Sequence, residues 1–229
     1  MSVLLDNFGY ILSGAAATVR LAALALVFTL AVGAIAGLLR LYAPLPIRWM
    51  SVAYIELFRG TPVLVQMFFI FFGLPLFLGW NPSAFTAATV ALVLNNGAYL
   101  AEIVRGGVQA ISREQWQAGT ALGLKFRQVL ASVVIPQALR RIIPPAVGQF
   151  TILVKDTSIA SAIGYFEMTR AGQHVVERTL APFEIFTLVG ALFFAICSAG
   201  SWLSHRLERR LSRAAPSGES EWRYVLGTR

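Results

Sequence analysis

The sequence is poor in charge. Of its 229 residues only 13% are Asp, Glu, Lys or Arg, whereas 57% are hydrophobic and the mean hydropathy is +0.68. Soluble domains carry about 25% charged residues, so this shortage excludes an ordinary soluble domain and indicates a polytopic membrane protein. The length predicts an all-α fold of about five spanning helices, with short loops and no separate soluble domain.

Cysteine and histidine are also scarce. The single cysteine, Cys197, excludes an intrachain disulfide and lies in an apolar run, where an inert thiol is expected. The two histidines and this cysteine are too scattered along the sequence to predict a metal site made of these residue types. The N-terminal stretch MSVLLDNFGY lacks a basic region, so we expect no cleavable signal peptide there.

The basic residues, which give a net charge of +8, lie between apolar runs and at the C-terminus. Positive cytoplasmic loops are typical of membrane proteins, and this pattern argues against a nucleic-acid-binding surface. It predicts an external N-terminus and a cytoplasmic C-terminus. The predicted spans are residues 14–41, 51–79, 84–104, 143–164 and 183–204. With a cytoplasmic loop, 105–141, they form one membrane domain, 1–210, followed by a flexible cytoplasmic tail, 211–229.

Charged residues interrupt the fourth predicted span. Lys155 and Asp156 lie about 12 residues beyond Pro144, which is roughly 18 Å along a helix and therefore near mid-membrane. Charges at this depth indicate a transport pathway or a binding site. Adjacent helical residues point about 100° apart, so these two cannot pair well with each other. The third predicted span offers Asn96 at a similar depth and Glu102 about 9 Å nearer the cytoplasm.

Two interpretations of this polar set stay open. Asp156 and the next two residues are of types that begin helices, so a helix broken there would present backbone groups to a small zwitterion. The alternative is a structural network between helices, for example one that joins Lys155 to Glu102. The second predicted span contains Arg59, Gly60, Thr61 and Pro62. Gly60 and Pro62 weaken the helix, which predicts either a gate near the cytoplasmic mouth or a static kink.

Residues 112–136, SREQWQAGTALGLKFRQVLASVVIP, are too polar to span a membrane. Ser112 and Gln115 resemble a capping box that begins a short helix, which ends near Leu122 with Gly123 as its cap. A second short helix, 126–135, is expected to stop before Pro136. Small residues in the first helix permit close approach of another surface. These properties fit protein docking and contact with lipid headgroups equally.

This loop resembles the EAA loop of ABC importer permeases, in which Glu-Ala-Ala and a later Gly precede Leu-Pro or Ile-Pro. The corresponding residues are Gln117, Ala118, Gly119, Gly123, Ile135 and Pro136. The stretches ELFRGTPVLVQMFFIFFGLP, NNGAYLAEIVRGG, IPQALRRIIPP, KDTSIASAIG and MTRAGQ narrow the resemblance to permeases for polar amino acids. Gln117 stands where the motif has glutamate, and Glu114, one turn earlier, is the candidate to take over its role.

The resemblance implies a type I importer subunit of the bacterial inner membrane, which moves polar or charged amino acids by alternating access. It implies a second permease subunit, two cytoplasmic ATPase subunits and an extracytoplasmic binding protein as partners, together with the lipid bilayer. The chain is then no enzyme and needs no cofactor, because ATP binds to the ATPase. In agreement, the phosphate-binding pattern GxxxxGK[ST] is absent.

The resemblance also implies roles for single residues. The solute site is expected at Asn96, Lys155, Asp156, Thr157 and Ser158, with Gln149 and Glu102 as further candidates. Lys155 would meet a carboxylate of the solute, and Asp156 an ammonium group. The ATPase is expected to dock on Glu114, Gln117, Ala118, Gly119, Leu122 and Gly123.

The alternative function is an ion channel or secondary carrier that uses Lys155 and Asp156 without an ATPase. It leaves the cytoplasmic loop unexplained, and binding of an ATPase to residues 112–124 separates it from the importer. A membrane enzyme is disfavoured, because the sequence offers no constellation of nucleophile and base near a water interface.

Overall fold

The computed structural model describes residues 2–212, and most of the predicted flexible tail, 213–229, lies outside the described residues. Every regular element described is a helix. The α-helices are α1 (Ser2–Tyr42), α2 (Leu45–Arg59), α3 (Val63–Phe68), α4 (Leu74–Leu78), α5 (Ala84–Gln109), α6 (Arg113–Ala121), α7 (Phe126–Val129), α8 (Ile135–Asp156), α9 (Met168–Thr179) and α10 (Pro182–Ser212). Two π-helical segments, Phe69–Gly73 and Leu130–Val134, and a 3-10 segment, Thr157–Ile163, join neighbouring helices.

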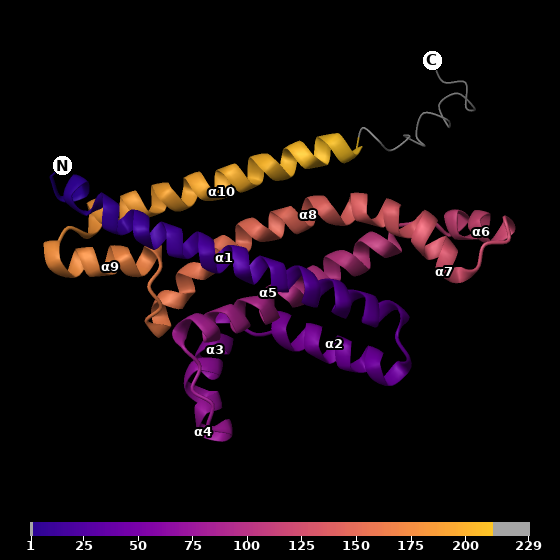
Figure 1. Ribbon diagram of the computed structural model, residues 1–229, viewed down its shortest axis with the longest axis horizontal. Coiled ribbons are helices and arrows are strands. Elements are labelled where there is room, and N and C mark those ends of the chain that lie inside the picture. The colour runs from indigo at the N-terminus through magenta and orange to yellow at the C-terminus, as the bar shows by residue number, and fades with distance from the viewer. Residues whose placement is uncertain (1, 213–229) are drawn as a thin grey trace, which may run out of the picture.

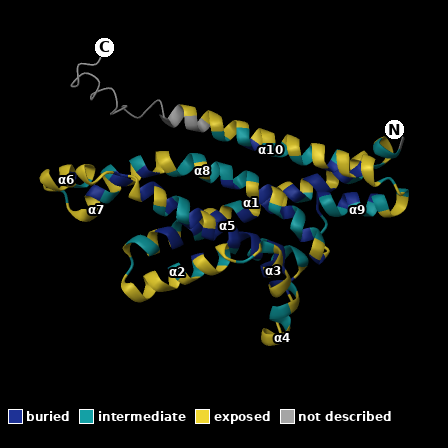
Figure 2. Ribbon diagram, turned by 180° about the vertical axis from the view of Figure 1, so that it is seen from behind, coloured by how far each residue is buried: buried dark blue, intermediate teal, exposed yellow. Residues whose placement is uncertain are grey.

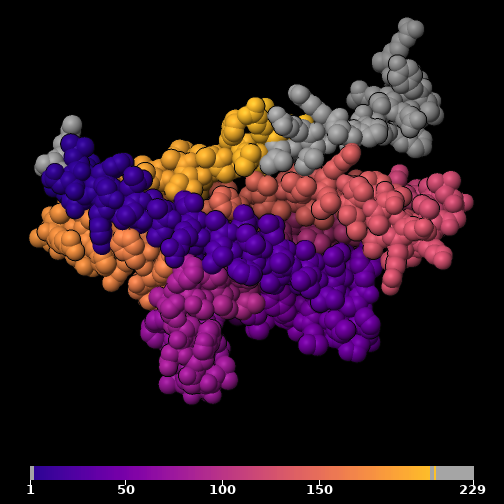
Figure 3. All heavy atoms as spheres, in the orientation of Figure 1, coloured from indigo at the N-terminus to yellow at the C-terminus, as the bar shows by residue number. Residues whose placement is uncertain are grey.

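The long helices share one direction. Helices α1, α5, α8 and α10 extend along the long axis of the molecule, with α9 at one end and α6 and α7 at the other (Figure 1). The segment from α3 to α4 projects sideways from this body, below α1 in the same view of the molecular surface (Figure 3). The two ends of the molecule are called here the α9 end and the α6 end.

Helix α5 forms the centre of the core. It is dark blue over most of its length in Figure 2, and its buried residues include Ala87, Ala91, Ala98 and Ala101. Small side chains let helices approach closely, which is how membrane helices associate without a hydrophobic driving force. On the facing helix α1, a Cβ added at Gly37 would lie 2.7 Å from the carbonyl oxygen of Ala101. The contact between α1 and α5 therefore requires glycine at this position.

Within the described residues, three helices are long and apolar enough to cross a membrane: Val3–Tyr42, Ala84–Gln109 and Pro182–Arg206. The bent pair Leu45–Gly60 and Val63–Leu78 makes a fourth if it counts as one span. Helix α8, which carries Arg140, Arg141, Lys155 and Asp156, is not among them. The multi-pass all-α fold is confirmed, whereas the count of five spans and their orientation stay predictions.

The second predicted span, residues 51–79, is interrupted by a sharp bend. The chain bends by 106° between α2 and α3. Pro62 lies in the extended region, with φ −64° and ψ 135°, and has no N–H to continue the hydrogen-bond ladder. The bend thus follows from the local sequence, and it turns α3 away from the axis of α2.

Three further boundaries differ from the prediction. Residues 126–135 do not form a separate helix that stops before Pro136, because the π-helical segment Leu130–Val134 leads directly into α8. Pro136 lies in the first turn of α8, where its missing N–H is tolerated. The fourth predicted span, 143–164, instead begins at Ile135 and ends as an α-helix at Asp156. The predicted loop 165–182 contains α9, whose first turn is capped by the buried carboxylate of Glu167.

Replacing Gly37 by alanine is expected to lower the thermal stability of the purified protein in detergent. The added methyl group overpacks the contact between α1 and α5, at a cost of about 1–3 kcal/mol. Gly9→Ala is the matched control on the same helix, because nothing lies within 4 Å of a Cβ added there. This control should leave the melting temperature unchanged or raise it slightly. Equal melting curves for the two variants would contradict the close contact.

Candidate functional site

A polar cavity of about 360 Å³ opens where the bend between α2 and α3 meets α5 and α8. Its lining comprises Thr61, Pro62, Val63, Asn95, Asn96, Tyr99, Gln149, Ile152 and Asp156. The bend contributes the first three residues, α5 the next three and α8 the last three. Pockets for small molecules combine apolar walls with a few convergent polar groups, as this one does. It is therefore the candidate solute site.

The bend is held open by side chains that satisfy its backbone. The Thr61 hydroxyl donates to the carbonyl oxygen of Leu57 at 2.8 Å. The amide of Gln66 donates to the carbonyl oxygens of Phe58 and Thr61, at 2.9 and 3.0 Å, and to the Thr61 hydroxyl at 2.8 Å. Asn95 on α5 also donates to Phe58, at 2.8 Å. The carbonyl groups freed by the interrupted helix thus have partners.

Three of the predicted solute residues meet in the cavity. Gln149 donates to Oδ1 of Asn96 at 2.8 Å, and the Asn96 amide donates to Oδ2 of Asp156 at 3.4 Å. The same amide nitrogen also donates to the carbonyl oxygen of Leu92 at 3.1 Å. Asn96 is fully buried, so both of its N–H groups are used within the protein. The network leaves Oδ1 of Asp156 without a hydrogen bond from the described residues.

The other predicted solute residues lie elsewhere. Lys155 is exposed on a different face of α8, outside the cavity lining. Thr157 is fully buried and its hydroxyl donates to the carbonyl oxygen of Val154, while the Ser158 hydroxyl donates to that of Lys155. Both hydroxyls therefore bond to the backbone of the preceding turn, and neither residue lines the polar cavity.

Glu102 does not pair with Lys155, the example that the sequence suggested for a structural network between helices. Its carboxylate accepts a hydrogen bond from Nη1 of Arg40 at 2.5 Å and two from the guanidinium of Arg105, at 2.8 and 3.0 Å. Nη1 of Arg59 lies 3.9 Å from Oε2 of the same carboxylate. One acidic residue thus joins the ends of α1 and α2 to α5. We call these four residues the Glu102 cluster.

The predicted gate residues divide between two places. Thr61 and Pro62 line the cavity, Gly60 caps α2, and Arg59 belongs to the Glu102 cluster. The guanidinium of Arg59 also lies 5.2 Å from the ring centroid of Tyr99, within cation–π distance. The gate region is therefore continuous with the candidate solute site.

Four residues of the lining were not among the predicted solute or gate residues. Asn95 and Tyr99 are four residues apart and share the face of α5 that bears Glu102. Ile152 stands in the same relation to Asp156 on α8. Helical spacing from the predicted polar residues would have found these three. Val63 follows the bend, and its place depends on a change of chain direction that spacing alone does not give.

The predicted coupling helix is present as α6. Its residues Glu114, Gln117 and Ala118 are exposed, as are Leu122 and Gly123 just beyond its end. Gly123 has φ +77°, a conformation that suits glycine after a helix and confirms it as the cap. Leu122, at 81% exposure, is a large apolar side chain with little contact inside the chain. A hydrogen bond from the Ser112 hydroxyl lowers the pKa of Glu114, so this carboxylate is ionised at neutral pH.

Two details of this helix differ from the prediction. Gly119 is buried and packs inside the chain, since a Cβ there would lie 2.9 Å from Val129. It therefore serves the contact of α6 with α7 instead of an outer docking surface. The Ser112 side chain makes no cap hydrogen bond, and Gln115 accepts one from Gln137 of α8 at 3.1 Å. This bond connects α6 to α8, the helix that carries Asp156.

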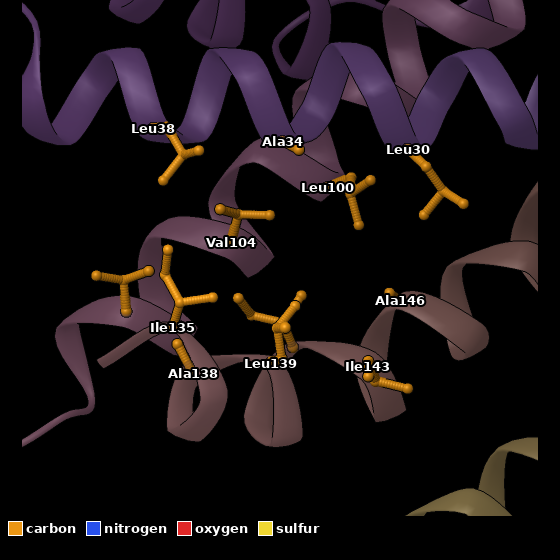
Figure 4. Close-up of a pocket in the computed structure, with 12 residues that line it drawn as sticks. Leu30, Ala34, Leu38, Leu100, Val104, Ile135, Ala138, Leu139, Ile143 and Ala146 are labelled. Atoms are coloured by element: carbon orange, nitrogen blue, oxygen red, sulfur yellow. The ribbon is translucent and has the colours of Figure 1, made fainter. Parts of the chain in front are cut away.

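A second cavity, of about 340 Å³, lies between α1, α5 and α8 (Figure 4). All of its lining side chains are aliphatic, and Leu38, Val104 and Leu139 point into it. It offers no hydrogen-bonding side chain to a polar solute, since transfer of an unpaired polar group into such surroundings is costly. The polar cavity is therefore the better candidate site.

Comparisons with known proteins show which family the chain belongs to. Residues 29–213 match the protein family described as binding-protein-dependent transport system inner membrane component. The chain is 38% identical over 202 residues to the glutamine transport system permease protein GlnP of Escherichia coli (strain K12), covering 88% of this chain and 92% of that protein. It is 37% identical over 210 residues to the L-cystine transport system permease protein TcyB of Bacillus subtilis (strain 168), covering 91% and 89%.

A solved structure shows the same fold. The structure described as an amino acid ABC transporter with histidines superimposes with a TM-score of 0.87 at 34% sequence identity. The match covers 90% of this chain and 96% of the chain in that structure. The arrangement of helices described above is therefore shared with a transporter subunit over nearly its whole length.

Replacing Glu102 by glutamine is expected to destabilise the protein by about 1–3 kcal/mol, because three arginines lose the carboxylate that joins them. The melting temperature in detergent measures this loss. Glu56→Gln is the control, since Glu56 is 63% exposed and lies 3.6 Å from Arg40, and an exposed pair contributes little. A Glu102→Gln variant as stable as Glu56→Gln would show that the cluster does not hold the helices together.

Proposed function

The chain belongs to the family of binding-protein-dependent transport system inner membrane components, and we propose that it is the transmembrane permease subunit of an ATP-driven importer for polar amino acids. The names of its relatives support this solute class, because they refer to glutamine and L-cystine. The chain itself is a membrane component without catalysis of its own. In the proposal a second permease subunit, two ATPase subunits that bind ATP and an extracytoplasmic binding protein complete the importer, which resides in the bacterial inner membrane.

The observation that carries the proposal is the polar cavity at the helix bend. Asp156 provides one negative charge there, and its carboxylate accepts a hydrogen bond from Asn96, which Gln149 holds in place. An ionised carboxylate in a membrane interior is stabilised by a cation. The α-ammonium group of an amino acid supplies that cation, and its size suits a cavity of about 360 Å³. We therefore place the transported solute between α5, α8 and the bend.

The α6 end faces the cytoplasm in this proposal, in keeping with the basic loops predicted from the sequence. The ATPase docks on the exposed part of α6 that includes Gln117, Ala118 and Leu122. Motion of α6 reaches α8 through Gln115 and Gln137, and α8 carries Gln149 and Asp156. The cavity then alternates between outward and inward access as α8 moves against α5.

The described residues do not favour the channel or carrier alternative. That function used Lys155 and Asp156 together as buried charges, whereas Lys155 is exposed and lies outside the cavity lining. The exposed face of α6, which that alternative leaves unexplained, has a use in the importer.

Asp156→Asn is expected to reduce ATP-driven uptake of the transported amino acid at least tenfold, because a charge-assisted hydrogen bond to the ammonium group is lost. Uptake is measured in proteoliposomes that hold the permease, its ATPase and the binding protein. Lys155→Met is the matched control on the adjacent residue, which lies outside the cavity, and should transport within about twofold of the wild type. Normal uptake by an assembled Asp156→Asn importer would exclude the proposed site.

Leu122→Asp is expected to weaken binding of the ATPase about tenfold or more, because a charge replaces an apolar side chain at the docking surface. Binding is measured by capture of the purified ATPase on immobilised permease. Leu180→Asp is the control, since Leu180 is 85% exposed and follows α9 at the opposite end of the molecule. If both variants capture the ATPase as well as the wild type, the docking surface lies elsewhere.

A further inference from the structure

The aliphatic cavity between α1, α5 and α8 is a groove that opens to the surroundings of the protein. Its floor is α5, where Leu100, Val104 and Val108 are buried. Its walls are α1 and α8, whose side chains Leu38 and Leu139 are exposed and point into the groove (Figure 4). The groove shares no lining residue with the polar cavity, so the two are separate sites.

The dimensions of the groove fit one extended hydrocarbon chain. Its α8 wall runs from Ile135 to Ala146, which is roughly 16 Å along a helix. The volume of about 340 Å³, divided by this length, gives a mean cross-section of about 20 Å². A helix with its side chains is about 10–12 Å across and is too wide for this space. The length corresponds to one leaflet, because the hydrocarbon core of a bilayer is about 30 Å thick.

Water is a poor occupant of this groove. Every side chain in the lining is aliphatic, and a buried water needs two to four polar partners. Engineered cavities with such walls stay dry at about 150 Å³ and accept apolar ligands instead. In a membrane the apolar molecules at hand are lipids, so an acyl chain is the occupant that the walls favour.

The end of the groove nearest to α6 is aromatic and basic. Tyr42 stands one turn beyond Leu38 on α1, and its ring centroid lies 5.9 Å from that of Phe126. Aromatic side chains of this kind occupy the level of the lipid headgroups. Lys125 and Arg127 flank Phe126 in the sequence, and both are exposed. No hydrogen bond or ion pair within the described part of the chain engages the Arg127 guanidinium, which is therefore available to a phosphate group.

The charge around this end selects the kind of lipid. Residues 105–141 contain six basic residues and one acidic residue, Glu114. Basic pockets between spanning helices on the cytoplasmic side bind the headgroups of anionic lipids. A lipid without net charge would fill the groove equally well but would gain less from Arg127. Charge complementarity thus favours an anionic phospholipid.

We propose that an anionic phospholipid of the cytoplasmic leaflet binds here, with one acyl chain in the groove and its phosphate group at Arg127. From the proposed function this inference takes only that the α6 end faces the cytoplasm. The chain lies between α1 and α8, and α8 also carries Gln149 and Asp156 of the polar cavity. The lipid therefore contacts the helix whose movement opens and closes that cavity in the proposed function.

The test is native mass spectrometry of the delipidated permease–ATPase complex, titrated with phosphatidylglycerol, which is anionic, or phosphatidylcholine, which has no net charge. The wild type should bind the first phosphatidylglycerol about fivefold more tightly than phosphatidylcholine. Ala34→Phe fills the groove from α1 and should weaken binding of both lipids at least tenfold, because the acyl chain loses its apolar contacts. Ala31→Phe is the matched control, since Ala31 is exposed on the same helix outside the lining, and should stay within about twofold.

A second pair of variants tests the headgroup. Arg127→Gln should weaken binding of phosphatidylglycerol about fivefold and leave that of phosphatidylcholine unchanged, because only the anionic lipid loses a charge partner. Arg48→Gln removes the same charge from an exposed position of α2, which does not line the groove, and should change neither affinity more than about twofold.

Ala146→Phe fills the groove from α8 and separates loss of the site from a local fault in α1. The inference is overturned if Ala34→Phe and Ala146→Phe complexes that melt like the wild type bind both lipids normally. An unchanged preference for phosphatidylglycerol in Arg127→Gln would show that the phosphate group lies elsewhere. If the filled groove releases the second permease subunit in the same spectra and leaves lipid binding unchanged, the groove receives that subunit instead of a lipid.

Discussion

The structure depends on the backbone groups freed by the bend between α2 and α3. In an apolar environment each unpaired carbonyl costs several kcal/mol, so an interrupted helix persists there only with substitute donors. Thr61, Gln66 and Asn95 supply these donors to Leu57, Phe58 and Thr61. Because Asn95 belongs to α5, the same interaction that stabilises the bend fixes it against the central helix. The polar cavity forms at that junction.

Two connections lead from the cavity to the α6 end. On one side the cavity borders the Glu102 cluster, in which Arg40 and Arg59 tie α1 and α2 to α5. On the other side α8 extends from Asp156 back to Gln137, which contacts α6. A movement of α6 therefore acts on one wall of the cavity, while the cluster holds the opposite wall. This arrangement suits alternating access, which needs one group of helices to move relative to another.

The sequence allowed prediction of what depends on periodicity and local signals. The apolar runs located α1, α5 and α10, and Gly123 marked the turn after α6. Depth along a helix, from the rise per residue, correctly placed Asn96 level with Asp156. Depth does not tell which way a side chain points across the bundle, so Lys155 was expected in a cavity that it does not line. For the same reason two of the arginine partners of Glu102, Arg40 and Arg59, were missed, since they come from the distant ends of α1 and α2. Gly60 and Pro62 indicated an interrupted helix, but the hydrogen bond from Asn95 that fixes the 106° bend against α5 is tertiary, and no local pattern indicates it.

The central claim is that a single amino acid is held between Asp156 and the helix bend during transport. Electron cryomicroscopy of the permease–ATPase complex, prepared with a saturating concentration of the transported amino acid, tests it most directly. The account predicts ligand density in the polar cavity, with the ammonium group within hydrogen-bond distance of the Asp156 carboxylate. Ligand density at another position in the membrane, or an empty cavity in a complex that demonstrably binds the amino acid, would contradict it.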